Sequence, residues 1–158
     1  MIISFYKDIL PDHEGRYLSD ILRETNSWLE NTHDYIQYLF PNREPSFYNP
    51  DAPLLSDQII EEFKSNTELL DNVKLSLNRM ILFYQMDDTK PWWVTKGNHN
   101  FLRITRILNT LRELGMIKEM GSFFNKLLII VTNNRNIIKD KTLDYWQNAF
   151  DGPLESVE

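Results

Sequence analysis

Apolar residues recur at helical spacing along most of this chain. The clearest case is the segment from Asn98 to Leu114. Its apolar line falls on one face of a helix and consists of Phe101, Ile104, Leu108 and Leu111. Gly115 follows directly, and glycine is the residue type that most often ends a helix. The pattern predicts a central helix over this segment, with the apolar line buried.

The same spacing predicts further helices along the chain. They cover Ser19 to Glu24, Asn26 to Phe40, Ser56 to Lys64, Ser65 to Tyr84, Ser122 to about Thr132 and Asp140 to Phe150. Ser65 and Glu68 have the spacing of a capping box, which predicts that Ser65 caps the longest of these helices. The apolar stripe of that helix predicts core packing and consists of Leu69, Val73, Leu77, Met80 and Tyr84.

No segment shows sustained apolar–polar alternation, so the expected fold is all-α. The length of 158 residues fits one compact multi-helix domain over residues 1–158. Residues 41–54 contain four prolines and are expected to be irregular but stiff. Phe47 and Tyr48 are expected to pin this segment to the body of the protein.

Composition narrows the possible functions. The net charge of −6 is wrong for a general nucleic-acid binder, so no nucleic-acid partner is expected. The absence of cysteine excludes disulfides, thiolate metal sites and a cysteine nucleophile. The N-terminus lacks the pattern of a signal peptide, and the longest apolar run, Leu127 to Val131, is too short for a transmembrane segment. A cytoplasmic location is expected.

Two polar lines interrupt the apolar pattern. In the predicted helix over Asn26 to Phe40, the polar face consists of Glu30, His33, Asp34 and Gln37. In the central helix, the polar line consists of His99, Arg103 and Arg106. Two guanidiniums one turn apart must be solvated or paired. We predict that Arg103 and Arg106 lie against the polar face, either as a structural network or as the floor of a pocket for an anionic or zwitterionic group.

The search for catalytic motifs finds no Walker loop, GxGxxG, GxSxG or HExxH, and no cofactor or metal is assigned. One enzyme hypothesis remains, a metal-dependent phosphohydrolase with an H…HD…D pattern. His13, the pair His33-Asp34, and Asp87 or Asp88 would supply it. Trp92-Trp93 is either a recognition patch or the anchor of a loop.

Three stretches resemble the conserved N-terminal domain of the opioid growth factor receptor family, also called the zeta-type opioid receptor. They are HDYIQYLFP at residues 33–41, FYNPDAPL at 47–54 and HNFLRITRIL at 99–108. Leu114-Gly115 supplies the LG that ends the family pattern, and Tyr38 stands where the family usually has Trp. The resemblance extends from about Ser19 to Phe150.

The chain resembles the compact version of this domain in bacterial relatives, so the long C-terminal extension of the animal receptors is not expected. The resemblance implies a helical, non-enzymatic, receptor-like domain. The family is sometimes described as membrane- or nucleus-associated, whereas this chain has neither a span nor a basic localisation cluster.

The leading hypothesis is a module that binds a peptide or a small anionic or zwitterionic ligand. Carboxylate and guanidinium together would hold the two ends of such a ligand. The candidate residues are His33, Asp34, Gln37, His99, Asn100, Arg103 and Arg106, with Arg43 or Glu44 at the rim. The alternatives are the phosphohydrolase and a structural or adaptor domain.

Overall fold

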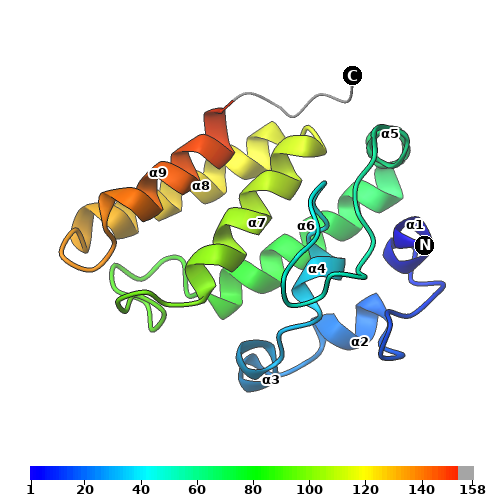
Figure 1. Cartoon of the computed structure of the whole chain (residues 1–158), viewed down its shortest axis with the longest axis horizontal. Coiled ribbons are helices and arrows are strands. Elements are labelled where there is room, and N and C mark those ends of the chain that lie inside the picture. Colours follow the sequence, from blue (N-terminus) through cyan, green and yellow to red (C-terminus); the bar gives the residue numbers. More distant parts are fainter. Residues whose placement is uncertain (153–158) are drawn as a thin grey trace. The chain divides into compact units, whose positions relative to one another are not determined.

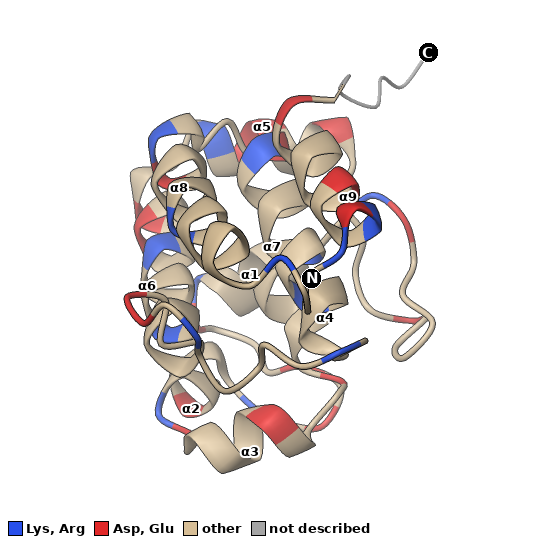
Figure 2. Ribbon diagram, turned by 90° about the vertical axis from the view of Figure 1, so that its left-hand side faces the viewer, with Lys and Arg blue, Asp and Glu red and all other residues tan. Residues whose placement is uncertain are grey.

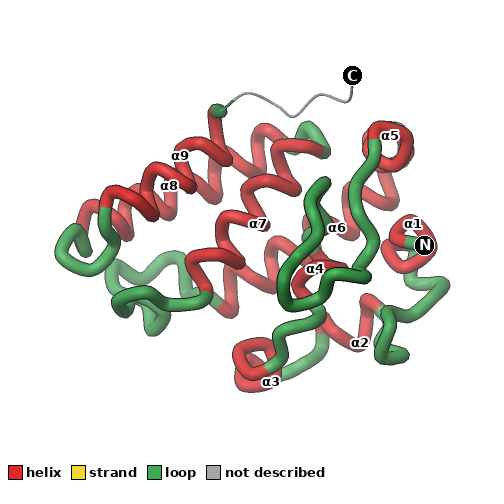
Figure 3. Tube along the Cα trace, in the orientation of Figure 1, coloured by secondary structure: helices red, strands yellow, loops and turns green. Residues whose placement is uncertain are grey.

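Helices joined by loops make up the described part of the chain, residues 1–152 of a computed structural model (Figures 1 and 3). These residues contain no strand, which confirms the all-α prediction. None of the described helices is long and apolar enough to cross a membrane. The chain divides into two compact units, unit 1 over residues 1–83 and unit 2 from Tyr84 onward. The expectation of a single domain stays a prediction.

Unit 1 contains six helices. They are α1 (Ile2–Tyr6), α2 (Leu18–Leu22), α3 (Asn26–Asn31), α4 (Ile36–Leu39), α5 (Asp57–Lys64) and α6 (Thr67–Phe83). The long helix α6 packs against α1, α2 and α5. The predicted apolar stripe from Leu69 to Tyr84 is buried, as expected. The hydroxyl of Tyr6 in α1 donates to the carbonyl of Leu39 and is hydrogen-bonded to Ser76 Oγ at 3.0 Å, which ties the N-terminal helix to α6.

The cap of α6 lies one residue later than predicted. The side-chain oxygen of Asn66 accepts the backbone N–H of Glu68 at 3.0 Å. Ser65 instead donates its hydroxyl to the carbonyl of Glu61 at 2.8 Å. The predicted capping role of Ser65 is therefore wrong, because this serine closes α5 and leaves the start of α6 to Asn66.

The predicted helix from Asn26 to Phe40 is also wrong. It is split into α3 and α4, and Thr32 between them has extended backbone angles, φ −108° and ψ 131°. The hydroxyl of Tyr35 donates to the carbonyl of Leu29 at 2.7 Å. The side-chain amide of Asn49 donates to the carbonyl of Asp34 at 3.1 Å. These bonds take carbonyls that a continuous helix would use, so residues 30–37 do not share one helical face.

The segment between α4 and α5 has no regular structure, as its prolines predict, and is the long green stretch beside α4 in Figure 3. Phe47 is 92% exposed and Tyr48 is 62% exposed, so the prediction that they pin the segment is wrong. Asn49, Ala52 and Leu55 are buried instead. Smaller buried side chains therefore attach the segment to the core, and the rings of Phe47 and Tyr48 are exposed to solvent.

Unit 2 contains α7 (Asn100–Glu113), α8 (Ile117–Asn133) and α9 (Asp140–Asp151). Helix α7 packs against both α8 and α9, which run alongside each other (Figure 1). Its predicted apolar line is buried. Gly115 ends the helix with φ +72°, as glycine permits, and donates its N–H to the carbonyl of Arg112. Residues of both charge signs occur along α8 and α9 (Figure 2).

The loop before α7 is anchored by its second tryptophan. Trp93 is buried and donates its indole N–H to the carbonyl of Tyr84 at 2.8 Å. Its ring meets Phe101 and Trp146 edge to face. Trp92 is partly exposed and stacks on Tyr84. The anchoring interpretation of this pair therefore holds for Trp93.

Candidate functional site

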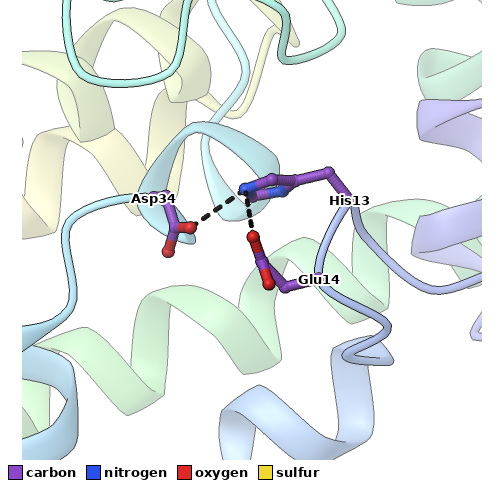
Figure 4. Close-up of side chains that lie close together, drawn as sticks. All are labelled: His13, Glu14 and Asp34. Carbon is purple, nitrogen blue, oxygen red and sulfur yellow. Dashed lines mark hydrogen bonds and ion pairs between the residues drawn. The ribbon is translucent and has the colours of Figure 1, made fainter.

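Asp34 lies at the break between α3 and α4 and meets the loop between α1 and α2. One of its carboxylate oxygens is 2.9 Å from Nε2 of His13, as Figure 4 shows. The other accepts a hydrogen bond from the guanidinium of Arg16 at 3.1 Å. The side chain of Asp34 is about a third exposed. Two segments that are distant in sequence thus meet through one carboxylate.

The loop that carries His13 and Arg16 is organised by Asp12, whose side chain is buried. One oxygen of Asp12 accepts the backbone N–H groups of Glu14 and Arg16, each at 2.9 Å. The other accepts Nε of Arg16 at 2.7 Å. Arg16 therefore bridges Asp12 and Asp34, and its guanidinium lies over the ring of Trp28.

The electrostatic surroundings keep Asp34 ionised. Burial alone raises the pKa of its carboxyl group, but the hydrogen bonds and charge of Arg16, together with those of His13, bring the pKa below its usual value. At neutral pH the break between α3 and α4 therefore carries a negative charge that is partly open to solvent.

Gln37 is the least satisfied polar residue of this region. Its side chain is buried, and its Nε2 donates to the carbonyl of His33 at 3.1 Å and to Ser46 Oγ at 3.2 Å. Its Oε1 is buried and has no hydrogen-bond partner. An unsatisfied buried acceptor costs about 1–3 kcal/mol. Native proteins contain few such atoms, and each one calls for an explanation.

Aromatic side chains lie near His33, whose carbonyl accepts the hydrogen bond from the Gln37 amide. The ring of Tyr48 is 6.0 Å from the ring of His33, and Phe47 meets Tyr48 edge to face at 5.7 Å. His33 is itself exposed. We call the group formed by His33, Asp34, Gln37, Ser46, Phe47 and Tyr48 the Gln37 site.

The two predicted rim residues follow α4. The guanidinium of Arg43 donates to the carboxylate of Asp57 at 2.8 Å, which ties the irregular segment to the start of α5. Glu44 is exposed. A role for either residue at the rim of a ligand site stays a prediction.

In unit 2, the polar residues of α7 form a buried network. Asn100 is fully buried, and its side-chain oxygen accepts the hydroxyl of Tyr84 at 2.9 Å and Nη1 of Arg103 at 3.5 Å. Its side-chain amide donates to Asn98 at 3.0 Å. His99, the first predicted residue of this line, is exposed. The structure thus brings Asn100 and Arg103 together.

The two arginines of α7 are withdrawn from solvent to different degrees. Arg103 is 6% exposed, and Arg106 is half-buried. Burial lowers the pKa of Arg106 to about 10, which still leaves it positively charged at neutral pH. The predicted contact of these arginines with the Glu30–Gln37 polar residues, and their role toward a ligand, stay predictions.

The structure brings together only part of the phosphohydrolase pattern, His13 and Asp34. Within residues 1–152, one group of imidazole and carboxylate donors is close enough to hold a metal ion, and it consists of His13, Glu14 and Asp34. His33 is not a member, and its ring lies near Tyr48 instead. Asp87 pairs with Lys126 at 2.7 Å.

Sequence reasoning missed the loop at residues 12–16 as part of the ligand-site hypothesis. The sequence pattern predicts His13 only as a metal ligand of the phosphohydrolase, and it predicts no role for Asp12 or Arg16. The available signal was an aspartate followed closely by glycine and arginine, which is typical of a turn held by the aspartate side chain.

Comparison with known proteins gives one family. The family model described as the opioid growth factor receptor (OGFr) conserved region matches residues 1–155. The human opioid growth factor receptor is 36% identical over 170 residues, which cover 93% of this chain and 25% of that protein. The mouse receptor is 32% identical over 165 residues, with 91% and 26% covered.

Mouse opioid growth factor receptor-like protein 1 is 33% identical over 169 residues, covering 91% of this chain and 35% of that relative. The chain thus spans about a quarter to a third of the length of these relatives. No solved structure gives a significant match. Since the family model covers nearly the whole sequence, the chain belongs to the opioid growth factor receptor family.

Proposed function

We propose that this chain is a non-enzymatic, receptor-type domain that binds a peptide-like ligand at the Gln37 site. The observation that carries the proposal is the buried and unpartnered Oε1 of Gln37. Its amide orientation is fixed, because Nε2 is the atom that donates to the carbonyl of His33. Oε1 is therefore an acceptor, and it calls for an N–H or O–H donor.

The neighbours of Gln37 favour a peptide over a simple ion. Asp34 is ionised and partly exposed, which favours a ligand with a positive charge such as a free amino terminus. Phe47 and Tyr48 are exposed aromatic residues, which are common anchors for apolar side chains. A short peptide combines N–H donors, an ammonium group and apolar side chains in one molecule.

The relatives support the non-enzymatic part of the proposal, since their names describe them as receptors. Those names describe receptors for an opioid growth factor. For this chain we propose a ligand class from its own site residues, a short peptide with a free amino terminus. The cytoplasmic location and the ligand-binding roles of His99, Asn100, Arg103 and Arg106 stay predictions.

A screen of short peptides with free termini, against the full chain, tests the proposal. Thermal shift identifies binders, and titration calorimetry measures their affinity. Binding to the folded state alone stabilises it by about 2.7 kcal/mol at a hundredfold excess over Kd. The N-acetylated twin of each binder, which lacks the ammonium group, is expected to bind at least about tenfold more weakly, a difference of about 1.4 kcal/mol.

Two variants locate the site. Gln37→Met removes the acceptor with little change in volume, and Phe47→Ser removes an exposed ring whose loss leaves the core intact. Both are expected to weaken peptide binding. Leu82→Ser is the matched control, because Leu82 is also exposed but lies on α6. A screen without binders, or full affinity in both site variants, contradicts the proposal.

A further inference from the structure

We propose that His13, Glu14 and Asp34 form a binding site for a divalent transition-metal ion, zinc in the first place. The three side chains face one another between the α1–α2 loop and the segment that joins α3 to α4, as Figure 4 shows. Their donor atoms all lie within 4.8 Å of one another. This group shares Asp34 with the Gln37 site, but His13 and Glu14 take no part in the peptide proposal, so variants of these two residues test the metal site alone.

The distances suit a small cation. Nε2 of His13 lies 2.9 Å from Asp34 Oδ2 and 3.9 Å from Glu14 Oε1. Zinc binds nitrogen and oxygen donors at about 2.0–2.2 Å, so its tetrahedral ligands lie about 3.4 Å apart. One observed distance is shorter than this value and the other is longer. Shifts of about half an ångström, small for side chains that are partly exposed, would bring both to it.

The donors are held by groups that do not themselves ligate. The imidazole of His13 is stacked on the ring of Tyr38, with centroids 5.5 Å apart and planes 11° apart. The guanidinium of Arg16 donates to Oδ1 of Asp34, so Oδ2 remains directed at His13. Asp12 fixes the turn through the backbone N–H of Glu14. Outer hydrogen bonds of this kind orient metal ligands and tune their affinity.

The charge balance also favours a cation. The guanidinium of Arg16 pairs with the carboxylates of Asp12 and Asp34, and the carboxylate of Glu14 lies 3.9 Å from Nε2 of His13. With a neutral imidazole the cluster is net negative. A divalent ion would neutralise it and would replace the hydrogen bond between His13 and Asp34.

The donor set selects the class of metal. Magnesium and calcium prefer oxygen donors alone, whereas an imidazole with carboxylates suits zinc and its transition-metal neighbours. Three protein ligands leave a fourth position for water. Zinc is therefore the ion to test first, and cobalt(II) is its spectroscopic substitute.

Zinc titration of the metal-free full chain, monitored by calorimetry, tests the proposal. We expect saturable binding of one ion per chain, and cobalt(II) should give visible absorption bands typical of ordered coordination. His13→Ala is expected to weaken zinc binding at least about tenfold, or 1.4 kcal/mol. Metal affinity is expected to fall on acidification, because the ligating groups must be deprotonated to bind the ion.

Matched variants separate this site from others. His33→Ala and His99→Ala each remove an exposed histidine and should leave zinc affinity unchanged. Glu14→Gln alters a side chain that is 60% exposed, so the fold is preserved while one ligand is lost, and affinity should fall severalfold. Absence of saturable zinc binding, full affinity in His13→Ala, or full affinity in Glu14→Gln overturns the proposal.

Discussion

The two signature segments at residues 33–41 and 99–108 follow their sequence patterns to different extents. Residues 100–108 lie in the continuous helix α7, as the apolar spacing predicts. Residues 33–41 follow a break and contain only the short helix α4. In the first segment, the side chain and the carbonyl of Asp34 both bond to distant parts of unit 1. A local pattern therefore decides the structure only where distant groups do not compete for the same atoms.

The two segments also differ in how their polar groups are satisfied. In α7, Asn100 is fully buried and bonds to Tyr84, Asn98 and Arg103. In the Gln37 site, a carboxylate is partly exposed and an amide oxygen has no partner. A satisfied network specifies and stiffens a fold, whereas an unsatisfied one is a candidate for recognition.

The largest loss of stability is expected from removing the indole ring of Trp146, which packs against α7. Trp146 is buried, packs on Phe101 and donates its indole N–H to the carbonyl of Phe101 at 3.1 Å. Trp146→Ala should lower the free energy of unfolding by about 3–5 kcal/mol. Trp28→Ala, near the break in unit 1, should cost clearly less, because Trp28 is only half-buried. Urea denaturation measures both, and equal losses would contradict the comparison.

A second pair of variants compares two buried tyrosine hydroxyls. Tyr84→Phe removes the bond to Asn100, and Tyr35→Phe removes the bond to the carbonyl of Leu29 at the break. Each leaves a buried acceptor with one donor fewer, so each should cost about 1–2 kcal/mol. Hydrogen exchange should then separate them. Tyr35→Phe should speed exchange around residues 29–36, and Tyr84→Phe should not.

Acidification tests the charge at the break. The pKa of Asp34 is lower in the folded protein than in the unfolded chain, so its contribution is present above the unfolded value of about 3.9. It is lost as the pH falls through the lower folded value. Asp34→Asn should cost up to about 1 kcal/mol at pH 6, because this carboxylate is partly exposed.

At pH 3 the stability difference between Asp34→Asn and the wild type should shrink. Urea denaturation in buffer with a metal chelator measures the variant at both pH values without any contribution from bound metal. An unchanged difference would show that the ionised carboxylate does not stabilise the folded state.

The smallest effect is expected from raising helix propensity at the break. Thr32→Ala replaces an extended β-branched residue with the best helix former. Because the bonds of Tyr35 and Asn49 hold the break, the change in stability should stay within about 0.5 kcal/mol. Helix content by circular dichroism should not rise. A rise equivalent to a full turn would show that local propensity alone makes the break.

The candidate site was predicted only in part. The pattern predicts Asp34 and Gln37 as site residues on one helical face, and the split into α3 and α4 removes that shared face. The bonds from Arg16 and Asn49 that shape this region come from residues 18 positions earlier and 15 positions later. Helical spacing reports on neighbours three or four positions away, so it contains no information about such partners.

The sequence by itself determined the helical class, the span and buried line of α7, the glycine that ends it, and the membership of the family. These features depend on local spacing and on residue identity. Only the tertiary structure decided that the segment at Thr32 is extended, that His13 meets Asp34, and that Gln37 keeps an unpaired oxygen. The physical reason is that a buried polar group takes the nearest suitable partner in space, and only the folded chain defines which groups are near.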